Sequence, residues 1–136
     1  MVVACYTESM DKLTILLIED DTLLRSALAG ELRFSNFNVL EAENGKEGLA
    51  VALAKHPDLI LLDVAMPVLD GISVMRRLRE DVWGKIVKII MLTSLSSSDF
   101  MMSEIMKGEP SYYLQKNTTD LGIVLSKVRE VLAVSA

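Results

Sequence analysis

Residues suited to phosphoryl chemistry stand at or just after the ends of several short apolar runs in this chain of 136 residues. They are Glu19, Asp20, Asp63, Thr93 and Lys116. Neighbouring carboxylates repel, and each raises the pKa of the other unless a cation lies among them. A small set of hard oxygen ligands suits Mg²⁺, which keeps several waters and pairs with phosphate oxygens. The acids therefore indicate a magnesium site at which a phosphoryl group is transferred.

Each candidate also has a simpler structural interpretation. Acids after a strand often only cap the following helix, which we expect of Asp21, and the two acids before it could be surface charges. Asp63 is the stronger candidate, because it follows four consecutive apolar residues and precedes another. Thr93 and Lys116 would not be candidates by themselves, and they become candidates only because they share the strand-end location of the acids. There they would supply a hydroxyl donor and a movable positive charge to an aspartyl phosphate.

Apolar runs and longer amphipathic stretches alternate five times along the chain. The apolar runs predict strands at 13–18, 37–41, 59–62, 87–92 and 112–115. The amphipathic stretches predict helices at 22–34, 46–54, 71–80, 97–107 and 118–132, with a turn at Asn44–Gly45. This order predicts an α/β fold, in which a doubly wound, five-stranded parallel sheet carries helices on both faces. Sites of such sheets lie at the carboxyl ends of the strands, where the candidate residues fall.

The composition is that of one folded domain, with 51% hydrophobic residues and a net charge of −5. The acidic excess argues against a nucleic-acid surface, which needs clustered lysines and arginines. Cys5 is the only cysteine, which fits a reducing cytoplasm, and the apolar runs are too short to span a bilayer. We expect a poorly ordered N-terminal extension at 1–12 and a single domain at 13–134.

Four segments carry a resemblance to a known family. They are ILLIEDD at 15–21, DLILLDVAMPVLDG at 58–71, IIMLTS at 89–94 and YLQK at 113–116. Together they resemble the receiver domain of two-component response regulators, in the CheY-like superfamily, from residue 14 to about residue 132. The Asp-x-x-Met-Pro-x-x-x-Gly element is the most specific piece. The resemblance implies a flavodoxin-like (βα)5 fold with strand order 2-1-3-4-5.

The resemblance implies a phosphoacceptor and a metal site. Asp63 matches the phosphorylated aspartate, and Mg²⁺ is the implied cofactor, which Mn²⁺ can replace. Asp20 matches the direct metal ligand, Glu19 a ligand acting through water, and the backbone carbonyl of Ala65 the third protein ligand. The expected phosphoryl donor is a histidine kinase, a histidine phosphotransfer protein, or a small donor such as acetyl phosphate. The protein would then be a cytoplasmic signalling switch and not an enzyme.

The resemblance also implies how phosphorylation is sensed. Thr93 matches the switch hydroxyl, Lys116 the lysine that contacts the phosphoryl group, and Tyr113 an aromatic that changes rotamer. In the family the fourth helix, fifth strand and fifth helix form the output face. We assign Met102 and Met106 to this face as a hypothesis, with core filling as the alternative. The face is expected to bind an output protein or domain of unknown identity, or a second copy, and neither nucleic acid nor a membrane.

Several positions depart from the family pattern. Asn117 follows Lys116 where the family usually has a cis-proline, and a cis bond before a non-proline residue costs about 2.5–4 kcal/mol. Lys116 therefore either reaches the site differently or tolerates strain. The segment KGEPSY at 107–112 replaces the usual glycine-centred turn, and Ala65 cannot orient an attacking water through its side chain.

Two other functions are weighed beside the phosphorylated switch. A degenerate receiver would bind partners without taking phosphate, which Asn117 leaves open and the complete set of acids argues against. A phosphohydrolase with an aspartyl-phosphate intermediate would need a second acid near the nucleophile, where this chain has Val64 and Ala65. Outside the site, His56 is interpreted as a bystander and Trp83 as a packing residue.

Overall fold

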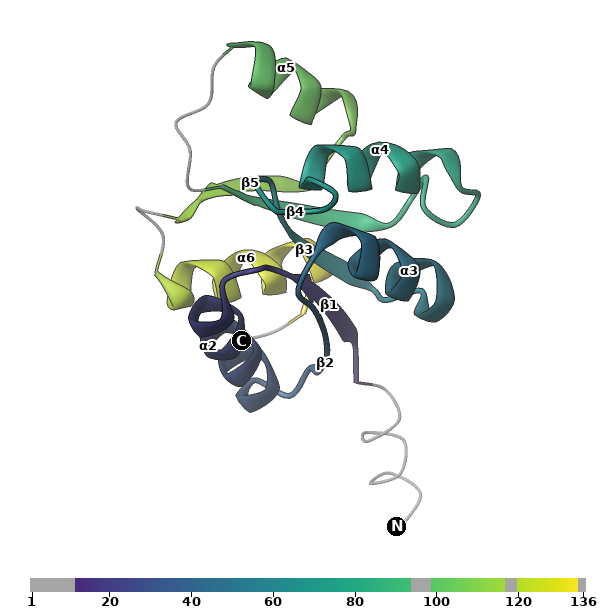
Figure 1. Ribbon diagram of the computed structural model, residues 1–136. Coiled ribbons are helices and arrows are strands. Elements are labelled where there is room, and N and C mark those ends of the chain that lie inside the picture. The colour runs from purple at the N-terminus through teal and green to yellow at the C-terminus, as the bar shows by residue number, and fades with distance from the viewer. Residues whose placement is uncertain (1–11, 94–98, 117–119, 135–136) are drawn as a thin grey trace.

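The computed structural model describes residues 12–93, 99–116 and 120–134, so the extension expected at 1–12 lies outside them apart from Lys12. The strands are β1 (Thr14–Ile18), β2 (Asn38–Ala42), β3 (Leu59–Asp63), β4 (Lys88–Thr93) and β5 (Tyr112–Gln115). The helices are α2 (Thr22–Phe34), α3 (Gly45–Lys55), α4 (Gly71–Glu80), α5 (Asp99–Lys107) and α6 (Leu121–Leu132). Strands and helices alternate as the sequence predicts (Figure 1).

The five strands form one parallel sheet in the order β2-β1-β3-β4-β5. The chain leaves β1 for β2 at one edge, then returns to the other side of β1 through β3 and continues to β5. The switch point of the sheet therefore lies between β1 and β3, where ligands of such folds bind. The predicted doubly wound α/β fold and its strand order are confirmed.

Two helical layers cover the sheet (Figure 1), with α3, α4 and α5 on one face and α2 and α6 on the other. In β1, Leu16 and Ile18 pack toward the first layer, while Ile15 and Leu17 pack toward the second. All four side chains are fully buried, because side chains of a strand alternate between its faces. Burial of each is worth about 1.5–3 kcal/mol relative to exposure. The uninterrupted apolar runs in the sequence reflect this double coverage.

Short polar side chains define where the helices begin. Asp21 caps α2 as expected, since its Oδ1 accepts from the backbone N–H groups of Leu23 and Leu24 at 3.0 and 3.2 Å. The predicted turn at Asn44–Gly45 is wrong. The Oδ1 of Asn44 accepts from the N–H of Glu47 at 2.8 Å, and α3 starts directly after this cap. None of the described helices is long and apolar enough to cross a membrane.

Candidate functional site

The candidate residues meet at the carboxyl edge of the sheet. Glu19 follows β1, Asp63 and Thr93 are the last residues of β3 and β4, and Lys116 follows β5. Strand register explains the meeting, because Ile18 pairs with Leu62 and so places the acids after β1 beside the end of β3. The sequence prediction that these positions share one edge is confirmed.

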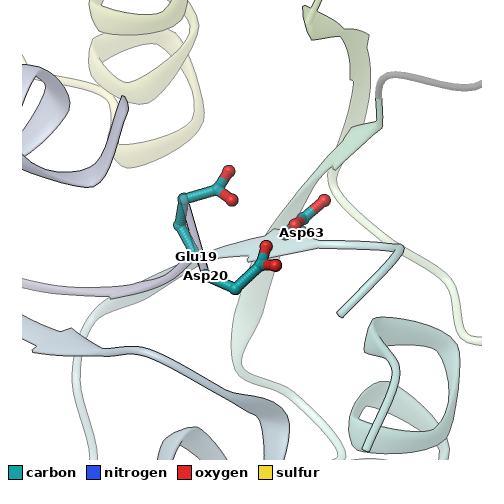
Figure 2. Close-up of side chains that lie close together, drawn as sticks. All are labelled: Glu19, Asp20 and Asp63. Atoms are coloured by element: carbon teal, nitrogen blue, oxygen red, sulfur yellow. The ribbon is translucent and has the colours of Figure 1, made fainter. Parts of the chain in front are cut away.

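Three carboxylates form a cluster at this edge. One oxygen from each of Glu19, Asp20 and Asp63 lies within 4.8 Å of the others. Figure 2 shows the three side chains gathered at the ends of β1 and β3. Glu19 is fully buried and Asp63 is 2% exposed, whereas Asp20 is exposed. The cluster is therefore anchored in the protein interior and open to solvent through Asp20.

Lys116 joins two of these carboxylates. Its Nζ lies 2.5 Å from Oε1 of Glu19 and 3.1 Å from Oδ1 of Asp63. Among the described residues, Lys116 is the ion-pair partner of Glu19 Oε1, which is buried and lacks an aligned hydrogen bond. The second oxygen of Glu19 accepts from the backbone N–H of Asp21 at 3.1 Å. An incompletely satisfied carboxylate oxygen in the interior is costly, and leaves room for a further cationic partner.

Burial and mutual repulsion shift the pKa values of these groups. Desolvation, and then the charge of Glu19, raise the pKa of Asp63 to about 7, although Lys116 opposes the shift. Burial also acts to raise the pKa of Asp20, but its hydrogen bonding with Asp63 and Glu19 outweighs this and leaves that pKa below its usual value. Desolvation lowers the pKa of Lys116, but both buried carboxylates more than compensate and raise it. The site thus holds a carboxyl group that ionises near neutral pH beside a permanent ammonium.

The loop after Asp63 has a fixed path. The N–H of Val64 donates to Leu92 across the sheet at 2.9 Å, and the N–H of Gly71 donates to the carbonyl of Val64 at 2.8 Å. A Cβ atom on Gly71 would collide with the carbonyl oxygen of Asp63. Val68 has a φ of 73°, which is strained for a β-branched residue. The glycine of the Asp-x-x-Met-Pro-x-x-x-Gly element is therefore required by close approach to the acceptor's own backbone.

The remaining predicted site residues lie in different surroundings. Ala65 is exposed and two residues beyond Asp63, and Thr93 is fully buried. Tyr113 is half-buried and packs against the core on the side of α3, α4 and α5, as does Met102. Met106 is 56% exposed, so the assignment of the two methionines to an output face stays a prediction. The Lys116–Asn117 bond, whose isomer is in question, lies outside the described residues.

Arg25 is a site residue that the sequence did not single out. Its Nη1 donates to the backbone carbonyl of Glu19 at 2.8 Å, and its Nε pairs with Glu41 at 3.3 Å. Arg25 thereby fixes the backbone that carries the acidic pair. The signal available in the sequence was the position of Arg25, one turn after the cap of a helix that begins just after Glu19 and Asp20. Arginines in such positions are usually solvated, so the position alone did not identify it.

The donor set fits Mg²⁺, which prefers oxygen ligands and near-octahedral geometry. Three carboxylates and one ammonium leave a formal charge of −2 at the cluster when all are ionised. A divalent cation balances that charge and would use the oxygens that now repel one another. The expectation that a metal is held here by Glu19, Asp20 and Asp63 is therefore compatible with the geometry.

The chain is similar to many known proteins. A family model described as "Response regulator receiver domain" matches residues 15–126. The phosphate regulon transcriptional regulatory protein PhoB of Pseudomonas aeruginosa is 36% identical over 99 residues, which cover 73% of this chain and 43% of that protein. The chain thus spans less than half of this curated relative.

Solved structures show the same architecture. The chemotaxis protein CheY4 of Vibrio cholerae superposes with a TM-score of 0.81 at 26% identity, covering 88% of this chain and 98% of that one. The receiver domain of sensor histidine kinase PA1611 from Pseudomonas aeruginosa, with magnesium in its active-site cleft, gives 0.80 at 25% identity, covering 90% and 98%. The extent of the family match, the sequence identity to a regulator and the shared fold agree. The chain belongs to the response regulator receiver domain family.

Proposed function

We propose that this receiver domain accepts a phosphoryl group on Asp63 in the cytoplasm, in a reaction that depends on Mg²⁺. The observation that carries the proposal is the carboxylate cluster, in which Glu19 and Asp63 are buried and Asp20 is exposed. Asp63 ends β3 beside two further carboxylates, and Lys116 lies 3.1 Å from its Oδ1. Two buried carboxylates beside a third, exposed one repel each other more than the single Lys116 can offset, and such unfavourable groupings are typical of functional sites.

The donor is expected to be the phosphohistidine of a kinase or phosphotransfer protein. A carboxylate oxygen of Asp63 forms a new O–P bond while the N–P bond of the donor breaks. The bonding electron pair returns to the imidazole nitrogen, which takes up a proton. Charge on the transferred oxygens is stabilised when opposite charge is already in position, and Lys116 is positioned for this. Mg²⁺ bound by Glu19, Asp20, Asp63 and the carbonyl of Ala65 would supply further positive charge.

Phosphorylation would then act as a binding switch and not as a turnover reaction. Thr93 ends the neighbouring strand β4 and is fully buried beside the acceptor strand. Met91 lies two residues before Thr93 on β4, and it pairs with Tyr113 on the neighbouring strand β5. A shift of the Thr93 hydroxyl toward the phosphoryl group would thus be felt at β5. The face of α5, β5 and α6, with the exposed Met106, is the proposed surface for an output partner or a second copy.

Intact mass spectrometry tests the acceptor. Wild-type protein is incubated with acetyl phosphate and Mg²⁺, and one acid-stable, base-labile phosphoryl adduct is expected. Asp63→Asn should abolish it, whereas Glu80→Gln, which changes an exposed acid on α4, should not. Labelling is expected to disappear when EDTA replaces Mg²⁺. An adduct that persists in Asp63→Asn refutes the acceptor, and no adduct on wild type supports the degenerate receiver.

A phosphohydrolase is the weaker second candidate. Such an enzyme needs an acid close to its nucleophile to handle the proton of the leaving group. The described residues near Asp63 offer Glu19 and Asp20, which share the cluster and serve as the proposed metal ligands. Position 65, which follows the acceptor closely, is alanine. The geometry therefore favours a stored phosphoryl group over rapid hydrolysis of a substrate.

A further inference from the structure

The peptide group that joins Glu19 to Asp20 is held from helix α2. The N–H of Glu19 donates to the carbonyl of Ala42 on β2 at 3.1 Å, and the chain then leaves the sheet. The carbonyl of Glu19 accepts from Nη1 of Arg25 at 2.8 Å. Because a peptide group is planar, the direction of this carbonyl also fixes the N–H of Asp20 and the position of its Cα. Arg25 therefore sets the position from which the Asp20 side chain starts.

Asp20 depends on its backbone more than the other two acids of the cluster do. Glu19 is buried and paired with Lys116, and Asp63 is nearly as buried at the end of β3. The Asp20 side chain is exposed, and Figure 2 shows it directed toward Asp63. An exposed side chain keeps more rotamer freedom than a buried one, so its place in the cluster rests on how its backbone is held. Groups that orient a metal ligand in this way set the affinity for the metal.

Arg25 is itself fixed by a second contact. Its Nε lies 3.3 Å from Oε1 of Glu41 on β2, and its side chain is only 14% exposed. The other carboxylate oxygen of Glu41 pairs with Arg33 at 3.1 Å, and Arg33 also donates to the carbonyl of Val39 at 3.2 Å. The donors of a guanidinium group are fixed in one plane, so Glu41 and the carbonyl of Glu19 together orient Arg25. The edge strand β2 thereby supports the acid pair.

We propose that Arg25 is a positioning residue of the metal site, and that Glu41 anchors it. Arg25 holds the backbone so that the Asp20 carboxylate stays within reach of a cation bound beside Asp63. Its role is to raise the affinity for Mg²⁺, and thereby the rate of phosphoryl transfer, without contacting the metal or the phosphoryl group. The inference rests on the proposed function, because Mg²⁺ is the ligand whose binding Arg25 would strengthen.

The sign of the effect separates positioning from charge alone. Arg25 carries a positive charge next to a carboxylate cluster that attracts a cation. If that charge acted only through space, its removal would strengthen Mg²⁺ binding, because like charges repel. If Arg25 positions Asp20, its removal weakens Mg²⁺ binding by about 10- to 100-fold, as is typical when a group that orients a metal ligand is lost. The two explanations therefore predict opposite changes in the same dissociation constant.

Arg33 provides a matched control on the same helix. It shares the partner Glu41 and also donates to a backbone carbonyl, but that carbonyl belongs to Val39 and not to the acid pair. The Mg²⁺ dissociation constants of wild type, Arg25→Met and Arg33→Met are measured by calorimetry at a temperature where circular dichroism shows each protein folded. Arg25→Met should raise the constant about tenfold or more, and Arg33→Met should leave it unchanged. An equal or lower constant in Arg25→Met overturns the proposal, as does an equal rise in both variants.

Two further variants test how Arg25 acts. Arg25→Lys keeps the charge and the aliphatic stem but loses the planar fork, so it should also weaken Mg²⁺ binding, and it carries the comparison should Arg25→Met not fold. Binding by Arg25→Lys as tight as wild type overturns the proposal. Glu41→Ala should weaken binding alone but add nothing to Arg25→Met, because the anchor acts only through Arg25; fully additive losses overturn its role as anchor. Absence of Mg²⁺ binding by wild type refutes the proposed function and this inference with it, whereas unchanged binding in the Arg25 variants refutes the inference alone.

Discussion

Replacing Asp63 by asparagine is expected to stabilise the protein in the absence of metal. The pKa of Asp63 is raised from 3.8 to about 7, a difference of about 3 pH units. At about 1.4 kcal/mol per unit, ionising this group in the folded protein costs on the order of 4 kcal/mol. Part of that cost is shared with Glu19 and offset by Lys116. We therefore expect Asp63→Asn to raise the free energy of unfolding at pH 8 by about 2–4 kcal/mol.

The sign of this effect depends on pH. The pKa of Asp63 is higher in the folded protein than in the unfolded chain, so between pH 4 and pH 7 the folded state binds more protons. Wild-type stability must then fall as the pH rises through this window. Below about pH 4 the group is neutral in both states, and the advantage of asparagine disappears. The stability difference should grow from pH 4 to pH 7 and stay constant above.

Urea unfolding in EDTA at pH 4.5, 6 and 8 measures this difference directly. At pH 8 the thermal midpoint should rise by about 3–5 °C for each kcal/mol in a domain of this size. Glu80→Gln provides the control for loss of one exposed acid on α4. Added Mg²⁺ should stabilise wild type and leave Asp63→Asn nearly unchanged. If Asp63→Asn is no more stable than wild type at pH 8, or if its gain is the same at all three pH values, the argument from buried charge is refuted.

Two further variants test the surroundings of the site, and a third tests an arginine that holds the loops before β4 and β5. Gly71→Ala should lower the free energy of unfolding in urea by about 2–4 kcal/mol, because a Cβ atom there meets the carbonyl of Asp63. Its control, Gly30→Ala, has open space around the Cβ atom and should raise the free energy of unfolding by about 0.5–1 kcal/mol. Equal effects of the two substitutions would contradict this reasoning. Lys116→Met should lower the free energy of unfolding in EDTA by about 3–5 kcal/mol, and added Mg²⁺ should restore part of this loss. An unchanged thermal midpoint would show that the ion pairs of Lys116 contribute nothing to stability. Arg79→Lys loses most of four hydrogen bonds to backbone carbonyls and should lower the free energy of unfolding, measured in urea, by about 2–4 kcal/mol. Full retention of the stability would show that water replaces these hydrogen bonds.

The fold was predictable because each buried strand is an uninterrupted apolar run and each run ends in a polar residue. Asp63 and Thr93 were found in this way, and the structure shows both as the last residues of their strands. Errors arose where an apolar side chain is buried outside a strand. Phe37 was predicted to start β2, but it is a buried residue of the preceding loop, and the strand begins at Asn38.

Two arginines that hold backbone segments in place, Arg25 at the site and Arg79 at the opposite end of the sheet, were not predictable for a different reason. Arg25 and Arg79 donate to backbone carbonyls, which every residue carries and which therefore leave no pattern in the sequence. On helices both look like solvated cations. The pairing of Lys116 with Glu19 was likewise hidden, since the resemblance assigned the lysine to the phosphoryl group alone. Long side chains that reach distant partners are fixed only by tertiary structure.

The position of Lys116 links the charge balance of the site to its proposed action. One ammonium cannot neutralise three carboxylates, and the pKa of Asp63 near 7 means that a proton supplies the missing positive charge below neutral pH. A divalent cation would displace that proton and weaken the hold of Glu19 and Asp63 on Lys116, because the same oxygens would be shared. The lysine would then be available to a phosphoryl group on Asp63. Since a proton on Asp63 opposes both metal binding and phosphoryl transfer, phosphorylation of this domain should depend on pH and on Mg²⁺ together.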